Sequence, residues 1–198
     1  MLNLKNIKKI SDEELMISVM DHHSHPALIE LHVRYSKKLL GYFIKMLNKD
    51  VEKAQDFVQD LFLKIMEKKH LYDPEKKFYT WVFTIACNMC KTAYRNPFLQ
   101  RISEDEFELN SKSTLGDNLA EKACFNELLV KSLNSLEEHH RTTFVLRFME
   151  HFSLQEIAEI TDTSVGTVKS RLFYATQKMS QKLKEYNPLY QTNLFKLS

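Results

Sequence analysis

Apolar residues along this chain recur at intervals of three and four positions, which is the spacing of one face of an α-helix rather than of a β-strand. The 198 residues include only 3 glycines and 4 prolines, so few residues interrupt the pattern. Apolar residues make up 43% of the chain, which is enough to bury one hydrophobic core or two small ones. The sequence therefore predicts an all-α protein.

The first half of the chain predicts four helices that can form one bundle. The first helix begins at Ser11, because Ser11 and Glu14 have the spacing of a capping box. The next three helices are expected after Pro26, from about Val51 to Lys69, and from about Lys77 to Arg95. We expect residues 1–95 to form the first domain.

The composition then changes in a way that predicts a linker. Residues 96–123 contain 3 basic and 6 acidic residues, and they lack an apolar stripe long enough to pack. The helical period returns after this segment. We therefore expect an acidic linker over residues 96–119, a second helical domain over residues 120–186 and a tail over residues 187–198.

Two amphipathic segments in the second domain have the pattern of a helix–turn–helix. Ser153 and Glu156 have the spacing of a capping box at the start of the first helix, and Thr161 to Ser164 turn the chain. Ser164 is well suited to cap the second helix. The inner apolar stripe of that helix consists of Val165, Val168, Leu172, Ala175 and Met179.

The outer face of this second helix has the chemistry of a major-groove reader. Residues 165–184 contain 5 lysine and arginine residues and no Asp or Glu, as expected of a surface that meets polyphosphate. Lysine and arginine can hydrogen-bond guanine edges, and hydroxyl groups can contact bases or phosphates. The pattern indicates DNA binding, and the alternative is a plain helical hairpin with a solvated lysine face.

These motifs resemble those of the extracytoplasmic-function (ECF) sigma factors, members of the sigma-70 family that serve bacterial RNA polymerase. The carboxy-terminal domain of these factors is similar to the segment Ser153–Ala158 followed by Val165–Leu172. The opening of that domain is similar to Ser135–Glu137 before Phe144–Arg147. Asp56–Phe62 resembles the helix that docks on the polymerase clamp, and Phe78–Ala86 resembles the segment that reads and melts the −10 element. The motifs stand in the order of the family and span about residues 11–185.

The resemblance implies that residues 1–95 are sigma region 2 and residues 120–186 are sigma region 4. It implies that the chain binds core polymerase and supplies promoter recognition, with no covalent chemistry and no cofactor of its own. On this interpretation the residues that read the −35 element, or lie near its phosphates, are Thr167, Lys169, Ser170, Arg171, Phe173, Tyr174, Arg147, Ser153 and Gln155.

The same resemblance places −10 recognition in the loop before the fourth helix and along that helix. The implied residues are Tyr72, Lys76, Lys77, Phe78, Tyr79, Trp81, Asn88 and Lys91. Aromatic side chains can replace the stacking that bases lose when the duplex melts. Helix spacing also puts Phe78 and Trp81 on an apolar stripe, so a role in the core stays open for each aromatic residue.

Polymerase contact is implied on the third helix, at Asp56, Gln59, Asp60 and Phe62. The alternative for the polar residues is an ordinary solvated helix face. The expected partners are core polymerase, promoter DNA and an anti-sigma factor, which is common in the family. No small-molecule substrate and no direct membrane insertion are expected.

Three positions depart from the family pattern. Asp162 stands where the family often has Gly, and Asp tolerates left-handed backbone geometry better than most residues. Thr84 and Tyr174 stand where basic residues are common, which weakens phosphate contact.

Metal, redox and catalytic sites find little support in the sequence. Cys87 and Cys90 form a C-x-x-C within an apolar helix, and Cys124 is far along the chain, so we expect buried small residues rather than a zinc or redox site. The histidine clusters, His22, His23, His25, His139 and His140, lack a helical metal spacing and are interpreted as surface residues. An enzyme is the least supported class of protein.

Two other function classes stay open at this point. A self-sufficient dimeric helix–turn–helix regulator would bind duplex DNA tightly without polymerase. An interaction protein would use its helix–turn–helix to dock another protein, although the acid-free segment 165–184 argues against this. The odd number of cysteines, 3, and the absence of a leader pattern predict a cytoplasmic, reduced protein.

Overall fold

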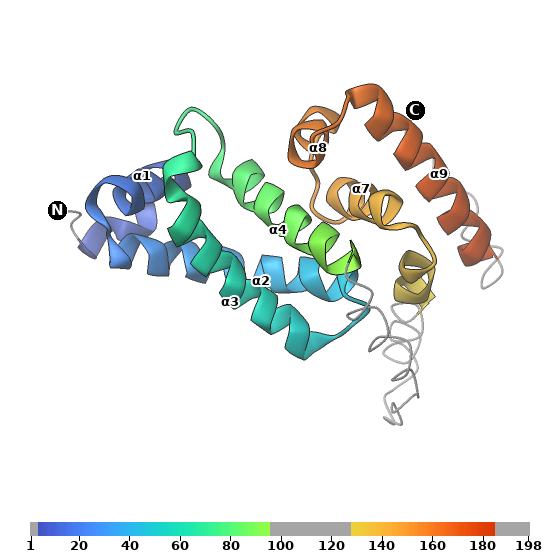
Figure 1. Ribbon diagram of the computed structural model, residues 1–198, viewed down its shortest axis with the longest axis horizontal. Coiled ribbons are helices and arrows are strands. Elements are labelled where there is room, and N and C mark those ends of the chain that lie inside the picture. Colours follow the sequence, from blue (N-terminus) through green and yellow to red (C-terminus); the bar gives the residue numbers. More distant parts are fainter. Residues whose placement is uncertain (1–3, 96–127, 185–198) are drawn as a thin grey trace. The chain divides into compact units, whose positions relative to one another are not determined.

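The computed structural model describes residues 4–95 and 128–184, and every regular element in these residues is a helix (Figure 1). The chain divides into two compact units, one comprising residues 1–95 and Ala158–Asp162 and the other comprising residues 96–157 and 163–198. The prediction of an all-α fold with two helical domains is therefore confirmed. The predicted linker, the predicted tail and Cys124 lie outside the described residues.

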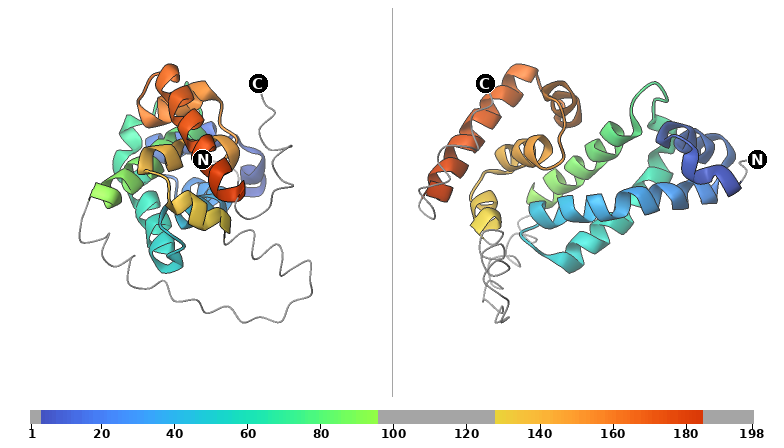
Figure 2. Two further views of the ribbon diagram at one scale, coloured as in Figure 1. Left: turned by 90° about the vertical axis from the view of Figure 1, so that its right-hand side faces the viewer. Right: turned by 180° about the vertical axis from the view of Figure 1, so that it is seen from behind.

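Four α-helices form the main part of the first unit. The elements are η1 (Leu4–Lys9), α1 (Asp12–His22), α2 (His25–Met46), α3 (Val51–Lys68), η2 (Lys69–Leu71) and α4 (Phe78–Arg95). Helix α2 contacts α1, α3 and α4 (Figures 1 and 2), so it is the central element of the bundle. The observed starts and ends of α3 and α4 lie within one residue of the predicted ones.

Side-chain caps explain why these helices begin where they do. The amide of Glu14 donates to Ser11 Oγ (3.2 Å) and the amide of Ser11 donates to Glu14 Oε2 (3.1 Å), which confirms the predicted capping box. Helix α2 begins one residue before Pro26, because Ser24 Oγ accepts from the amide of Ala27. Proline fits this first turn, where its missing N–H would have no partner within the helix.

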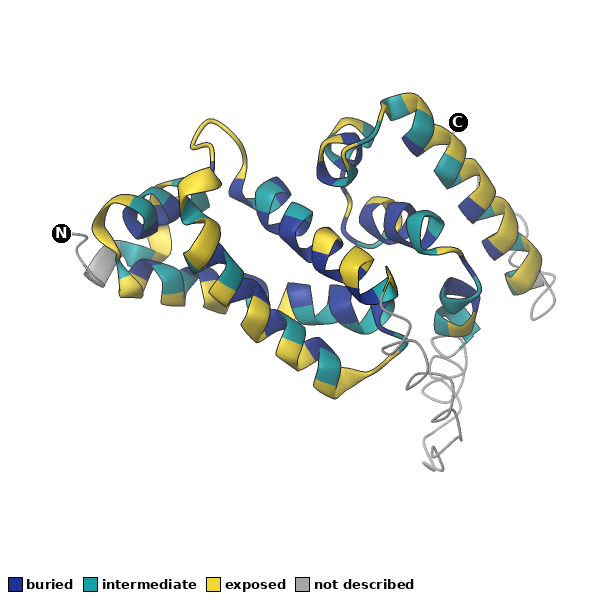
Figure 3. Ribbon diagram, in the orientation of Figure 1, coloured by how far each residue is buried: buried dark blue, intermediate teal, exposed yellow. Residues whose placement is uncertain are grey.

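The core of the bundle is built from apolar side chains of α1 to α4. Tyr42, Phe43, Leu61 and Phe83 have no exposed surface, and Figure 3 shows the buried sides of the helices facing one another. The rings of Tyr42 and Phe83 pack edge to face with centroids 5.3 Å apart, a favourable aromatic geometry. Cys87 and Cys90 form no disulfide and are both buried, which confirms their interpretation as core residues.

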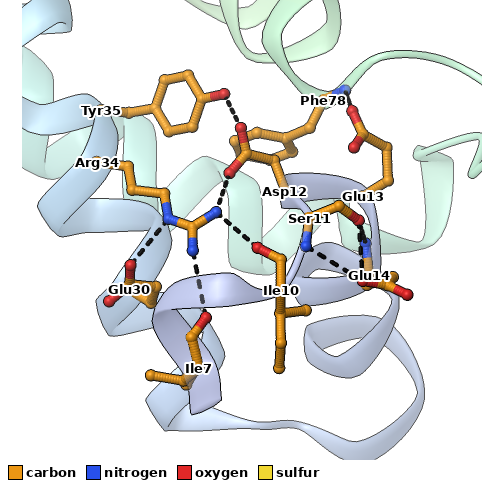
Figure 4. Close-up of polar contacts among 10 residues, drawn as sticks. All are labelled: Ile7, Ile10, Ser11, Asp12, Glu13, Glu14, Glu30, Arg34, Tyr35 and Phe78. Atoms are coloured by element: carbon orange, nitrogen blue, oxygen red, sulfur yellow. Dashed lines mark hydrogen bonds and ion pairs between the residues drawn. The ribbon is translucent and has the colours of Figure 1, made fainter.

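A polar cluster around Arg34 joins the N-terminal segment to α2 (Figure 4). The Arg34 guanidinium donates to four acceptors, which are Asp12 Oδ1 (2.6 Å), Glu30 Oε1 (2.8 Å) and the carbonyl oxygens of Ile10 (2.9 Å) and Ile7 (3.2 Å). The other carboxylate oxygen of Asp12 accepts a hydrogen bond from the Tyr35 hydroxyl. Because several partners share one guanidinium, the cluster fixes η1 and α1 more firmly than a single surface ion pair would.

The cluster around Arg34 should make the free energy of unfolding depend on pH. Burial, and then the hydrogen bond to Asp12, raise the pKa of Tyr35. The unfolded chain ionises its tyrosines near pH 10, whereas folded Tyr35 stays protonated, so the free energy of unfolding should fall as the pH rises above about 10. Each pH unit in this range costs at most about 1.4 kcal/mol per such group.

The substitution Tyr35→Phe removes this ionisation, so the variant should lose less stability than the wild type between pH 8 and pH 11 by urea unfolding. The lost hydrogen bond should lower its stability at pH 8. Identical losses in the two proteins would contradict the assignment.

The second unit contains α7 (Glu138–Phe148), α9 (Val165–Lys184) and the start of α8 (Leu154–Thr161), preceded by helical residues 128–134; the rest of α8, from Ala158, is grouped with the first unit. Helix α7 packs against α9, and Val145, Leu146 and Met179 are fully buried. Arg141 is 4% exposed, and its guanidinium donates to the carbonyl of Asn134 (2.9 Å). Across residues 4–95 and 128–184, no helix combines the length and the apolar character needed to cross a membrane.

Candidate nucleic-acid interface

The predicted helix–turn–helix has the local geometry that its sequence indicates. The amide of Glu156 donates to Ser153 Oγ (3.2 Å) and the amide of Ser153 donates to Glu156 Oε2 (2.9 Å), so the second capping box is confirmed. The amide of Thr167 donates to Ser164 Oγ (3.1 Å), which caps α9 as predicted. Asp162 in the turn has a φ of 52°, which is the left-handed geometry that Asp tolerates better than most residues.

The left-handed geometry of Asp162 predicts how the turn responds to substitution. Asp162→Val should destabilise the fold by about 1–2 kcal/mol, because a β-branched residue is strained at positive φ. Asp162→Gly should leave stability unchanged or raise it, because Gly adopts this geometry without a steric cost. Urea unfolding of the two variants measures the difference, and equal stability of the two variants would show that the turn carries no strain.

Helix α9 separates a buried face from an exposed one (Figure 3). Val168, Ala175 and Met179 are fully buried, whereas the Phe173 side chain is 63% exposed and that of Tyr174 is 56% exposed. The remaining predicted readers on this helix are exposed or half-buried, namely Thr167, Lys169, Ser170 and Arg171. The structure therefore brings six predicted −35 residues onto the accessible part of one helix.

The three predicted phosphate contacts before α9 differ in their surroundings. Gln155 is exposed in the first turn of α8. Arg147 is exposed, and its Nη1 atom donates to the carbonyl of Phe152 (3.0 Å), which orients the guanidinium. Ser153 uses its hydroxyl oxygen as the helix cap, so its first role is structural.

The four aromatic candidates for −10 recognition fall into two pairs. Phe78 has no exposed surface and Tyr72 is 3% exposed, so both belong to the core of the first unit. Tyr79 and Trp81 are half-buried. Only the second pair offers part of a ring to a base without a rearrangement of the fold.

Contacts that the sequence does not reveal fix the loop before α4 and the start of α4, where these aromatic residues lie. The Tyr72 hydroxyl donates to the carbonyl of Lys76 (2.6 Å), which shapes the loop before α4. The amide of Phe78 donates to Glu13 Oε1 (3.0 Å), so a carboxylate from α1 caps α4 (Figure 4). The Lys38 ammonium lies 4.4 Å from the centre of the Tyr79 ring, a cation–π contact.

The polar candidates near the aromatic residues are exposed, namely Lys76, Lys77, Asn88 and Lys91. Asn88 lies seven residues after Trp81 on α4, and Lys91 lies three residues after Asn88, so the three share one side of the helix. This side presents a partly exposed ring, an amide and a cation together, which is a chemical combination suited to single-stranded nucleic acid.

The predicted polymerase-binding face of α3 is also accessible. Asp56, Gln59 and Asp60 are exposed and follow one side of the helix. Phe62 is 7% exposed and its ring centre is 4.7 Å from that of His32, so Phe62 lies in the core rather than with the polar residues.

Sequence reasoning missed an exposed apolar residue beside the polar face of α3. Leu63 is 62% exposed and completes the Asp56, Gln59 and Asp60 stripe at the next turn. Ile29 and Val33 on α2 are similarly exposed, at 63% and 66%. The helical period of α2 locates its buried stripe, but it does not show which apolar residues outside that stripe are exposed.

Comparison with protein families finds two matches in the chain. The model described as "Sigma-70 region 2" matches residues 31–97, and the model described as "Sigma-70, region 4" matches residues 126–179. Together these matches contain most of α2, all of α3 and α4, all of α7 and α8, and most of α9.

Curated relatives agree with these matches. The "ECF RNA polymerase sigma-E factor" of Haemophilus influenzae is 29% identical over 160 residues, covering 76% of this chain and 84% of that protein. The "ECF RNA polymerase sigma factor RpoE" of Cereibacter sphaeroides is 28% identical over 168 residues, covering 84% of this chain and 92% of that protein. The similarity therefore extends over both units.

Two solved structures are similar in fold. One is CnrH in complex with the cytosolic domain of CnrY, with a TM-score of 0.67 and 22% identity over 88% of this chain and 97% of that chain. The other is the sigma factor RpoE in complex with the anti-sigma factor NepR from Bartonella quintana, with a TM-score of 0.60 and 23% identity over 78% of this chain and 95% of that chain.

Proposed function

We propose that this chain, which belongs to the sigma-70 family of RNA polymerase sigma factors, binds core polymerase and directs initiation at specific promoters. Among the members of that family it is an ECF sigma factor, in line with its curated relatives. In this proposal α9 reads the −35 element, and the loop before α4 together with α4 reads and melts the −10 element. The acid-free, exposed face of α9 is the observation that carries the proposal.

The residues on α9 are of two kinds, some suited to binding DNA tightly and others suited to choosing its sequence. Lysine and arginine side chains neutralise phosphates and supply most of the affinity, whereas contacts with base edges choose the sequence. Arg171 is half-buried, so its guanidinium is more restrained than an exposed lysine and is suited to bidentate contact with guanine. We therefore assign Arg171 to base reading and Lys169 to phosphate contact.

The polar face of α3 is proposed as the contact with core polymerase. Asp56, Gln59 and Asp60 offer two carboxylates and one amide, which suit a basic and polar partner surface. Leu63 adds apolar area that a partner would cover. Phe62 is proposed to support this face from the core.

An anti-sigma factor is a further proposed partner. The similar sigma factor from Bartonella quintana was solved with an anti-sigma factor bound. The exposed side chains of Ile29 and Val33 supply an apolar surface that such a partner would cover. The proposal requires no catalytic chemistry of this chain, and it implies that the chain works in the bacterial cytoplasm, where promoters and polymerase meet.

The self-sufficient dimeric regulator is not favoured. The sigma interpretation accounts for the first unit through the match to region 2, whereas the regulator interpretation leaves that match unexplained. The two proposals also predict different behaviour of the purified protein, because a dimeric regulator binds paired half-sites by itself.

Run-off transcription tests the proposed function. Purified bacterial core polymerase is assayed with and without the protein on genomic fragments that include the region upstream of its own gene, and a gel shift of the protein alone runs in parallel. We expect discrete transcripts only when core polymerase and the protein are both present, and weak duplex binding by the protein alone. Tight binding of a palindromic duplex, with nothing added to polymerase, would instead establish the dimeric regulator.

A further inference from the structure

Three side chains that can ligate a metal ion meet at the start of α7. Glu137 directly precedes the helix, and His139 and His140 lie in its first turn. One carboxylate oxygen and one nitrogen from each imidazole all lie within 4.8 Å of one another. Within the parts of the chain that the structure describes, no other three histidine, cysteine or acidic residues come this close.

We propose that Glu137, His139 and His140 form a binding site for a divalent transition-metal ion of the zinc type. Two imidazole nitrogens and one carboxylate oxygen match the preference of Zn²⁺, whereas Mg²⁺ and Ca²⁺ prefer oxygen ligands alone. Three protein ligands leave one tetrahedral position for water. None of the three ligands is among the residues that the proposed function uses, although the His140 ring centre lies 6.0 Å from that of Tyr174 on α9.

The distances at the site are close to those that coordination requires. A tetrahedral ion bound at about 2.0–2.2 Å holds its ligand atoms roughly 3.4 Å apart. His139 Nε2 already lies 3.4 Å from Glu137 Oε2, and the centres of the two imidazole rings are 4.2 Å apart. Small rotations of the side chains, rather than backbone movement, would complete the geometry. Glu137 is exposed and both histidines are half-buried, so an ion can enter from solvent.

The surrounding charges limit how tightly the ion is held. The cationic groups of Arg171 and Lys178 on α9 act on His140, and the positive end of the α7 dipole lies at the site. These groups repel a cation, so chelation by all three ligands must supply the binding energy. We therefore expect a dissociation constant of roughly micromolar order rather than the much tighter binding of buried structural zinc sites.

Titration of the full chain with ZnCl₂ by isothermal calorimetry tests the site, and the absorption spectrum of bound Co²⁺ reports its geometry. We expect a bound Co²⁺ ion with the intense absorption of four-coordination. The double variant His139→Ala/His140→Ala should weaken Zn²⁺ binding by at least about tenfold, and Glu137→Gln should weaken it by about tenfold. MgCl₂ should give no binding heat at this site.

A matched control removes two histidines elsewhere. The double variant His22→Ala/His25→Ala loses two exposed imidazoles from α1 and α2, so it should bind Zn²⁺ at the α7 site like the wild type. The backbone carbonyl of His139 accepts from Thr143 Oγ1 (2.7 Å), a bond that alanine preserves, and circular dichroism checks the fold of each variant. The proposal is overturned if the α7 variant binds like the wild type, or if both double variants lose binding equally.

Discussion

Replacing Trp81 with alanine is expected to lower transcription from a duplex promoter by about 5- to 150-fold, because stacking on an aromatic ring contributes roughly 1–3 kcal/mol per unpaired base. Trp81 is half-buried and shares one side of α4 with Asn88 and Lys91. Run-off transcription on a duplex and on a template mismatched at the −10 element measures the effect. Because the mismatched template is already open, the variant should recover most of its activity there.

A second aromatic variant separates melting from folding. Phe78 is fully buried beside Trp81, with ring centres 6.1 Å apart. Phe78→Leu should lower the free energy of unfolding, yet it should affect the duplex and the mismatched template equally. If Trp81→Ala also lost activity equally on both templates, Trp81 would be a core residue and not a melting residue.

Replacing Arg171 with alanine is expected to weaken open-complex formation at a cognate promoter by about 5- to 150-fold, since one bidentate contact with a base is worth roughly 1–3 kcal/mol. The variant should also lose discrimination between the cognate −35 element and one substituted at a single base pair. Transcription from the two promoters is measured with the wild type and with the variant at several salt concentrations. It gives both the loss of open-complex formation and the loss of discrimination.

Lys182 provides the matched control for Arg171. It is an exposed cation on the same helix, about three turns further on. Lys182→Ala should leave discrimination unchanged, and any loss of affinity should be the same for both promoters and smaller at high salt. Intact discrimination in Arg171→Ala would remove Arg171 from base reading.

Local signals in the sequence predicted the helices and their starts. Ser11, Ser153 and Ser164 each cap a helix as predicted, because a cap depends on residues three positions apart. The left-handed backbone geometry of Asp162 likewise depends on the residue type at that one position. The resemblance to a family added the candidate site residues on α3, α4 and α9, which periodicity alone could not have assigned.

Contacts between distant segments were not predictable in the same way. The burial of Tyr72 and Phe78 depends on how the loop and α4 pack on α1, and the Lys38–Tyr79 contact joins two helices. His139 and His140 were interpreted as surface residues, because their spacing is not that of a helical metal motif, and Glu137 was not considered with them. The cluster forms because Glu137 precedes the helix and folds back toward the first turn.

The capping of α4 by the Glu13 carboxylate also has a consequence for the order in which the chain folds during protein synthesis. Its partner amide, that of Phe78, lies 65 residues further along the chain. At about 5–20 residues per second, a ribosome adds Phe78 roughly 3–13 s after Glu13. The nascent α1 therefore leaves the exit tunnel well before the helix that it caps, and the first turn of α4 gains this cap only after both segments have emerged. The bundle therefore closes late in the synthesis of the segment that forms it.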